Sequence, residues 1–239
     1  MNQPPADGSD DRGPGRETTS AGGESTDPLP ADPMFAEVAD IVTFIEAPEP
    51  DLWIRPSTPP ATIEIVEHDP AWAEHYAVIA DSIRDSLART GCFVGIDHVG
   101  STSVPGLKAK PILDIALVVT EPRHEDDYVP ALNSIGLDLT VRESAWYQHR
   151  LLKRLDPAQG QMHCNVHVFG PRCAEVARMR LFRDHLRTHP DDRERYQAVK
   201  LASAAQANAA GETVTDYNAR KQSVLREIYH RIFAGRGWV

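Results

Sequence analysis

Apolar residues recur along most of the chain with the two spacings that distinguish strands from helices. Alternating or continuous apolar runs predict strands over Thr62–Val66, Phe93–Val99, Pro111–Val119, Arg150–Leu155 and Met162–Phe169. Apolar residues at steps of three and four predict helices over residues 70–89, 125–134, 173–188, 191–209 and 214–234. This order predicts an α+β (α/β) fold, a mixed β-sheet with flanking helices and a C-terminal helical subdomain.

The first sixty residues differ from the rest in composition. Residues 1–33 are rich in Pro, Gly, Ser, Thr and Asp, which predicts disorder because they cannot bury enough apolar surface to offset their ordering entropy. Apolar residues at helical spacing in residues 34–45 allow a short helix that docks on the body or on a partner. Residues 47–60 are proline-rich and are interpreted as a linker. The chain is therefore divided into an acidic tail, residues 1–60, and a folded domain, residues 61–236.

Charge follows the same division. Residues 1–60 carry twelve acids and three bases, and the remainder carries 23 acids and 22 bases, so nearly all of the net −10 lies in the tail. A nucleic-acid partner is not expected, because neutralising phosphates takes clustered Lys and Arg. No apolar run is long enough for a membrane span and no signal-peptide pattern occurs, so we expect no membrane partner and a cytoplasmic location. The three cysteines form no CxxC pair and are interpreted as reduced, mostly buried thiols.

The sharpest local feature is the segment HVGSTSVPGLKAKPILDI, residues 98–115. Gly100 lets backbone amides approach a ligand, and the hydroxyls of Ser101, Thr102 and Ser103 add donors, a combination that cradles phosphate. Lys108 and Lys110 add positive charge to the same loop. Asp114 interrupts an apolar strand, where a carboxylate must be paired, hydrogen-bonded or bound to a metal. The alternative is a simple tight turn that Asp114 caps.

The same segment resembles the signature of the GrpB family, a branch of the nucleotidyltransferase superfamily. Three further segments resemble that family in the same order: VEHDPAW at residues 66–72, LFRDHLRTHPDDRERYQAVK at 181–200 and YNARK at 217–221. The resemblance covers residues 61–235 and implies a nucleotidyltransferase-type fold. A related domain is fused to dephospho-CoA kinase.

The resemblance also implies roles for individual residues. Gly100 and Ser101 correspond to the Gly-Ser pair that holds a nucleoside triphosphate such as ATP, and Asp114 to the first of the carboxylates that bind Mg²⁺ in the superfamily. The second carboxylate is absent, because Ala116 stands in its place. The later strand offers His163, Asn165 and His167 but no acid. The expected cofactor is therefore a divalent metal with Asp114 and His167 as its candidate ligands: Mg²⁺, as in the superfamily, with Mn²⁺ or Zn²⁺ as the alternatives because imidazole suits them better.

Other candidates have two interpretations each. His98 is a proton-transfer group or a hydrogen-bond anchor at the end of its strand. His167 is a proton-transfer group or metal ligand, or an ordinary polar strand residue. The pairs Tyr196/Lys200 and Tyr217/Lys221 lie one helical turn apart, and such pairs commonly pack on a surface. However, residues 171–239 carry 13 bases against 8 acids, so Lys200 and Lys221 can form a cationic wall facing the loop. Arg150, with Lys153 and Arg154, contributes to the same site or is solvated edge charge.

Two functions follow from these features. The first is an enzyme that binds a nucleotide with a divalent metal and transfers a nucleotidyl group to a small-molecule acceptor, or activates a carboxylate for amide formation. In it Asp114, His98 and His167 carry the chemistry. The second is a catalytically silent module that binds a nucleotide or phosphometabolite and engages a protein partner through its N-terminal tail. The absent second carboxylate favours the silent module, and the retained loop favours phosphate binding in both.

Overall fold

The computed structural model describes residues 32, 34–45, 52–53 and 62–239. All of them belong to the unit Ala31–Val239. The predicted disorder of residues 1–33 lies outside the described residues except at residue 32, and the predicted linker does so except at residues 52–53.

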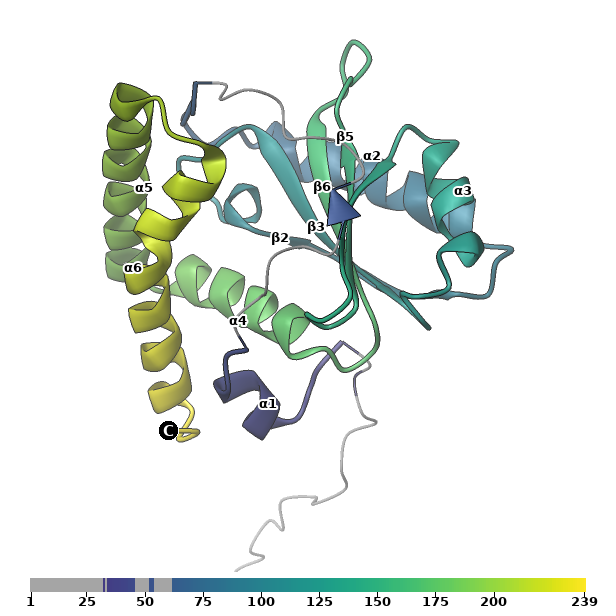
Figure 1. The fold of residues 1–239 in the computed structure, drawn as a ribbon. Coiled ribbons are helices and arrows are strands. Elements are labelled where there is room, and N and C mark those ends of the chain that lie inside the picture. Colours follow the sequence, from purple (N-terminus) through teal and green to yellow (C-terminus); the bar gives the residue numbers. More distant parts are fainter. Residues whose placement is uncertain (1–31, 33, 46–51, 54–61) are drawn as a thin grey trace, which may run out of the picture. The chain divides into compact units, whose positions relative to one another are not determined.

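A six-stranded mixed sheet forms the centre of this unit (Figure 1). Its strands are β1 (Leu52–Trp53), β2 (Phe93–Val99), β3 (Ile112–Val119), β4 (Asp138–Glu143), β5 (His149–Arg154) and β6 (His163–Phe169). They lie in the order β1-β4-β5-β6-β3-β2, in which β3 and β6 are parallel and every other pair is antiparallel. The predicted α+β fold with a mixed sheet is confirmed.

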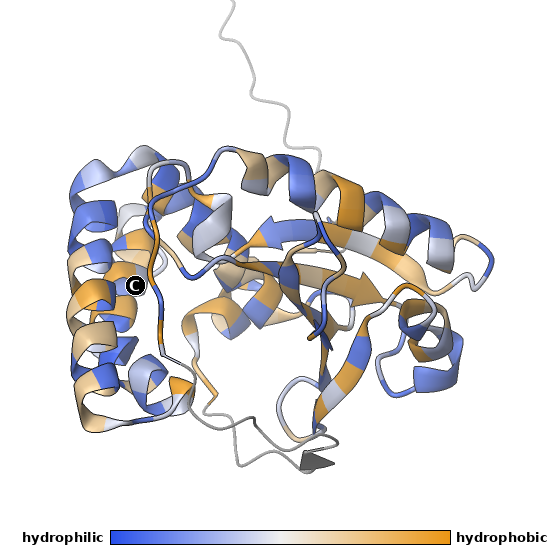
Figure 2. Ribbon diagram, turned by 90° about the horizontal axis from the view of Figure 1, so that it is seen from above, coloured by the Kyte–Doolittle hydropathy of each residue, from blue (hydrophilic) through white to orange (hydrophobic). Residues whose placement is uncertain are grey.

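Helices cover the two faces of the sheet. The helices, apart from the short α1, are α2 (Ala71–Leu87), α3 (Val129–Asn133), α4 (Ala174–Thr188), α5 (Pro190–Ala210) and α6 (Val214–Gly235). Helices α2 and α3 pack with Leu113, Ile115 and Leu117 of β3 on one face, and α4 packs with Ala116 and Val118 on the other. Figure 2 shows the central strands largely in orange and the helices in mixed blue and orange, as expected for elements that bury one face.

Four elements differ from the prediction. Thr62–Val66 is not a strand, because Val66 makes only an isolated bridge to Ala109 and the side-chain amide of Asn208 bonds both backbone groups of Ile63. The helix predicted over 125–134 is split into a 3₁₀ turn, Glu125–Asp127, and α3. Strand β4 was not predicted, and β1, which pairs with it, lies in the stretch predicted to be a linker. The other predicted strands and helices are confirmed to within a few residues.

The segment at residues 34–45 contains the short helix α1 (Val38–Val42), and it lies against the body of this unit. The buried guanidinium of Arg178 donates hydrogen bonds to the carbonyl oxygens of Ile41, Asp40 and Thr43, at 2.9, 2.9 and 2.6 Å. Burying a cation is tolerated only where acceptors surround it. The packed body therefore includes residues N-terminal to the predicted boundary at residue 61.

Two further expectations concern the chain as a whole. Cys92, Cys164 and Cys173 are free and buried, as predicted. Among the described residues, no helix has the length and apolarity needed to cross a membrane.

Candidate functional site

The loop after β2 approaches β3 so closely that only glycine fits at its first position. Gly100 has φ +68° and ψ −170°, a conformation that other residues rarely adopt. A Cβ atom built on Gly100 would lie 2.7 Å from the Cβ atom of Asp114. The antiparallel register pairs Val99 with Asp114, so the Asp114 carboxylate lies directly beside the loop. The sequence predicted this pair of residues as a site, and the structure places them in contact.

Side chains from α4 and α5 hold the loop from outside. Arg183 donates to the carbonyl oxygen of His98 at 2.9 Å, and Arg187 donates to that of Ser103 at 3.0 and 2.8 Å. The Nζ of Lys200 donates to the carbonyl oxygen of Lys108 at 2.6 Å. The C-terminal helices therefore fix both ends of the loop relative to the sheet.

His98 stands behind the loop. Its Nε2 lies 3.0 Å from the Thr102 hydroxyl, and its ring stacks on Tyr76 at a centroid distance of 4.6 Å. Burial lowers the pKa of His98 to about 4, so the ring is neutral at pH 7. His98 does not line the pocket described next. Of the two interpretations of His98, this placement favours the hydrogen-bond anchor at the end of the strand over the proton-transfer group.

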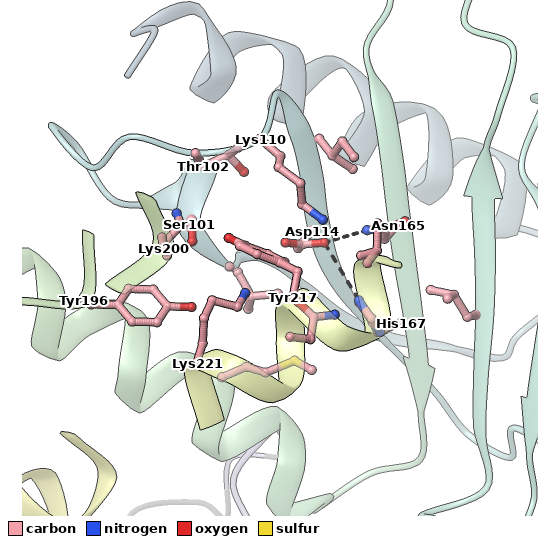
Figure 3. A pocket seen from close by; sticks show the side chains of 18 of the residues that line it. Ser101, Thr102, Lys110, Asp114, Asn165, His167, Tyr196, Lys200, Tyr217 and Lys221 are labelled. Carbon is pink, nitrogen blue, oxygen red and sulfur yellow. Dashed lines mark hydrogen bonds and ion pairs between the residues drawn. The ribbon is translucent and has the colours of Figure 1, made fainter. Parts of the chain in front are cut away.

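A pocket of about 370 Å³ opens beneath the loop, between the sheet and the C-terminal helices (Figure 3). This volume is within the range of small-molecule sites. Its polar lining comes from β3, β5, β6, the loop, α5 and α6: Ser101, Thr102, Lys110, Asp114, Lys153, Asn165, His167, Tyr196, Lys200, Tyr217, Asn218 and Lys221.

Asp114 is the single acidic residue among the described residues that line the pocket. The side-chain amide of Asn165 donates to its Oδ1 at 2.8 Å, and the Nε2 of His167 lies 3.9 Å from the same oxygen. Burial by itself would raise the pKa of the Asp114 carboxyl. His167, Asn165 and Lys110 outweigh this effect and lower the pKa, so Asp114 is ionised at pH 7.

Four lysines surround this carboxylate. Burial lowers the pKa of each, to about 7 for Lys200 and about 8 for Lys221, and also below the ordinary value for Lys110 and Lys153. The Tyr217 ring lies near both Lys221 and Lys110, whose Nζ atoms are 4.0 and 5.5 Å from its centroid. The lowered pKa values mean that burial disfavours the charged forms of these lysines, and a neighbouring anion would offset this effect.

The residues present do not fit a two-metal centre. Asp114 and His167 are the two predicted ligands, and no cluster of three or more His, Cys, Asp or Glu side chains able to hold a metal occurs in the described parts of the chain. Mg²⁺ prefers several oxygen ligands, and four neighbouring ammonium groups disfavour a bare cation. Ala116 is fully buried against Val118 and Phe169, so an acid at that position would enter an apolar cluster.

Arg150 and Lys153 lie on the same strand, β5, but their side chains lie on opposite faces of the sheet. Arg150 pairs with Val168, so it points to the α2 face, where it binds the carboxylate of Glu125 at 2.5 Å. Lys153 pairs with Asn165 on the pocket face. Of the basic residues predicted on this strand, Lys153 lines the pocket and Arg150 does not.

Three other candidates do not line the pocket. The Nζ of Lys108 forms an ion pair with Glu67 at 2.5 Å, and the hydroxyl of Ser103 donates to the carbonyl oxygen of Gly100 at 2.6 Å. His163 is exposed, and its Nδ1 lies 3.3 Å from the carbonyl oxygen of Arg154.

Two residues that the sequence did not indicate lie behind His167. The Nδ1 of His167 is 3.1 Å from the Nε2 of His149, and the Nδ1 of His149 bonds the carboxylate of Glu143. Glu143 ends β4, a strand that was not predicted, so no pattern in the sequence placed this residue near β6. Alternation in Leu139 and Val141 is the one signal that could have revealed this strand.

Comparisons with known proteins agree on one family. The sequence model of the family described as "GrpB protein" matches residues 62–231. The UPF0157 protein BH1888 of Halalkalibacterium halodurans is 40% identical over 171 residues, covering 72% of this chain and 83% of that protein. A dephospho-CoA kinase of Mycolicibacterium paratuberculosis is 28% identical over 192 residues, covering 72% of this chain and 46% of the kinase. The crystal structure of the conserved protein GrpB from Enterococcus faecalis superposes with a TM-score of 0.58 at 26% identity, covering 71% of this chain and 99% of that one.

Proposed function

The chain belongs to the GrpB family, and from the geometry of its pocket we propose that it binds a nucleotide or another small phosphate-bearing molecule there. The observation that carries this proposal is the set of four lysines around one carboxylate beneath the Gly-Ser loop: Lys110, Lys153, Lys200 and Lys221. Such a set suits a ligand with more than one negative charge, because each ammonium group gains charge stabilisation when the anion enters.

The loop supports the same ligand. Ser101 and Thr102 line the pocket, where the Ser101 hydroxyl and the backbone amides of these two residues would add hydrogen bonds to phosphate oxygens. Tyr217 presents an aromatic ring at the side of the pocket, against which a base or other flat group can pack.

The experiment is calorimetry with inorganic triphosphate, ATP and adenosine. We expect triphosphate and ATP to bind and adenosine to bind far more weakly. Lys221→Met should weaken triphosphate binding at least tenfold, about 1.4 kcal/mol. The matched control is Lys108→Met, which removes a lysine of the Gly-Ser loop whose side chain lies outside the pocket. Equal losses in the two variants would contradict the proposal.

Metal dependence gives a second test of the same proposal. The four lysines would neutralise the phosphate charge, a role that metal ions would otherwise have and for which Asp114 and His167 supply too few ligands. Triphosphate binding should therefore persist in EDTA, and Mg²⁺, Mn²⁺ or Zn²⁺ should change it little. Loss of binding in EDTA would mean that a divalent ion, entering with the phosphates and held by Asp114 and His167, is required.

A transfer reaction is the second candidate, and Asp114 with His167 is the observation in its favour. In it an acceptor hydroxyl attacks the α-phosphorus of a nucleoside triphosphate, the new O–P bond forms, and the bond to pyrophosphate breaks. The hydroxyl proton passes to His167, and the lysines neutralise the departing pyrophosphate. Ala116, which stands where the superfamily has its second carboxylate, favours the silent binding module instead. Release of pyrophosphate from ATP in the presence of an acceptor would separate the two.

A further inference from the structure

The lysines of the pocket approach it from two ends. Lys200 and Lys221 come from α5 and α6, and Lys200 is bound to the carbonyl oxygen of Lys108 in the loop between β2 and β3. Lys153 comes from β5, which lies beyond β6 on the other side of β3. Neighbouring strands are about 4.8 Å apart, so β5 lies about 10 Å from β3. The pocket therefore has a helix end and a β5 end.

Asp114 lies between these two ends. It belongs to one row across the sheet with Asn165 and Lys153, because Asn165 pairs with Asp114 on β3 and with Lys153 on β5. In Figure 3 the lysines of the helix end lie on one side of Asp114, and Asn165 lies on the other side. Besides burial, Lys110 and Asp114 are the charges that affect the pKa of Lys153, and both also affect the pKa values of the helix-end lysines. This agrees with a position of Lys110 and Asp114 in the middle of the pocket.

The Lys153 side chain makes no hydrogen bond or ion pair in the described parts of the chain, although it is partly buried. Asp138 is its neighbour on β4, but Asp138 does not line the pocket and forms no ion pair with Lys153. Removing an ammonium group from water without giving it a partner is unfavourable, and a methionine would fill the same space without this penalty. An anionic group of a ligand would supply the partner that the protein does not.

The carboxylate of Asp114 keeps the two ends apart electrostatically. An anionic group placed directly over this carboxylate is repelled by it. A run of phosphates that crossed Asp114 from the helix end to Lys153 would meet this repulsion. The two ends therefore suit two separate anionic groups, with an uncharged or positively charged part of the ligand between them.

We propose that Lys153 forms a second anion-binding subsite, which takes a carboxylate or phosphate group other than the phosphates held at the helix end. The ligand class is then a phosphate-bearing molecule with a second anionic group, or a phosphate-bearing molecule bound together with an anionic acceptor. This inference rests on the proposed function for the helix end. For the β5 end it rests on the strand register and on the lysine without a partner.

The test is calorimetry in which protein saturated with inorganic triphosphate is titrated with succinate and, separately, with inorganic phosphate. We expect at least one of these anions to bind the parent, because the β5 end stays free while triphosphate occupies the helix end. The tighter of the two shows whether the subsite prefers a carboxylate or a phosphate. Lys153→Met should weaken this binding at least tenfold, about 1.4 kcal/mol, whereas Lys153→Arg, which keeps the charge, should largely retain it. Lys108→Met is the matched control and should bind like the parent.

The affinity for triphosphate itself separates the two ends. Lys221→Met should weaken triphosphate binding at least tenfold, and Lys153→Met should weaken it by about threefold or less. Lys153→Gln, which is polar and uncharged, guards against a folding defect and should behave like Lys153→Met.

Three results would overturn the inference. They are a triphosphate-saturated parent that binds neither anion, equal anion binding by the parent and both uncharged variants, and equal losses of triphosphate affinity in Lys153→Met and Lys221→Met. The proposed function fails separately, if the parent does not bind triphosphate but still binds one of the anions in a way that depends on Lys153.

Discussion

Lys200 offers a direct test of the pocket's electrostatics. Its side chain is 2% exposed, and its Nζ donates to a backbone carbonyl of the loop. Burial, assisted by the charge of Lys221, lowers the pKa of Lys200 from 10.5 to about 7. The unfolded chain therefore holds this proton more tightly than the native state, and stability must rise with pH between the two pKa values.

The magnitude follows from the same pKa values. Between pH 7 and pH 9 the native protein loses most of the Lys200 proton while the unfolded chain keeps it. This should raise the unfolding free energy by about 2 kcal/mol, an order-of-magnitude figure. Lys200→Met keeps the length of the side chain and removes the titration. The gain between pH 7 and pH 9 should therefore be about 2 kcal/mol smaller in Lys200→Met than in the parent.

The assay is urea unfolding followed by circular dichroism at both pH values. The control is Lys108→Met, because this lysine is partly exposed and paired with Glu67 outside the pocket. It should keep the parent's gain. Equal gains in the parent and in Lys200→Met would refute the assignment of Lys200 as a buried, proton-binding group, and with it the argument that an entering anion restores its charge.

Three further predictions concern the loop, the N-terminal segment and the position of the absent acid. Gly100→Ala should destabilise the protein by about 1 to 3 kcal/mol, measured by the urea midpoint, and should displace Asp114, measured by the loss of triphosphate binding. An unchanged urea midpoint would contradict the close approach of Gly100 to Asp114. Deleting residues 1–45 should lower the unfolding free energy by about 3 kcal/mol, and with it the melting temperature, because Arg178 loses its carbonyl acceptors. Deleting residues 1–31 keeps these acceptors and is the control. Ala116→Asp should lower the unfolding free energy by about 2 kcal/mol without creating Mg²⁺ binding in calorimetry, since the new carboxylate would be buried among apolar side chains; tight Mg²⁺ binding would show that the site accepts a second acid.

The sequence predicted the parts of the site that are contiguous in the chain. Gly100, Ser101 and Asp114 belong to one strand–loop–strand unit, whose register is short-range and whose polar residues stand out against apolar neighbours. Lys200 and Lys221 could be predicted as candidates because each lies one helical turn from a tyrosine. Predicting these residues did not depend on the register between strands that are far apart in the sequence.

The parts that could not be predicted depend on register between strands far apart in sequence. A shift of one residue moves a strand side chain to the opposite face, and this distinguishes Arg150 from Lys153. Glu143 and His149 could not be predicted for the same reason: they lie near His167 only because β4, β5 and β6 align in this register. Thr62–Val66 shows the opposite error, since its alternation is real but a side-chain amide takes the place of a neighbouring strand.

The close approach of Gly100 to Asp114 has a consequence for how the family can vary. A side chain at position 100 and a carboxylate at position 114 compete for the same space, so neither position can change freely while the other stays the same. Across related sequences we expect the two positions to covary. Chains that have lost the glycine should also have lost the aspartate while keeping the fold, since the two residues share one volume at this end of the sheet.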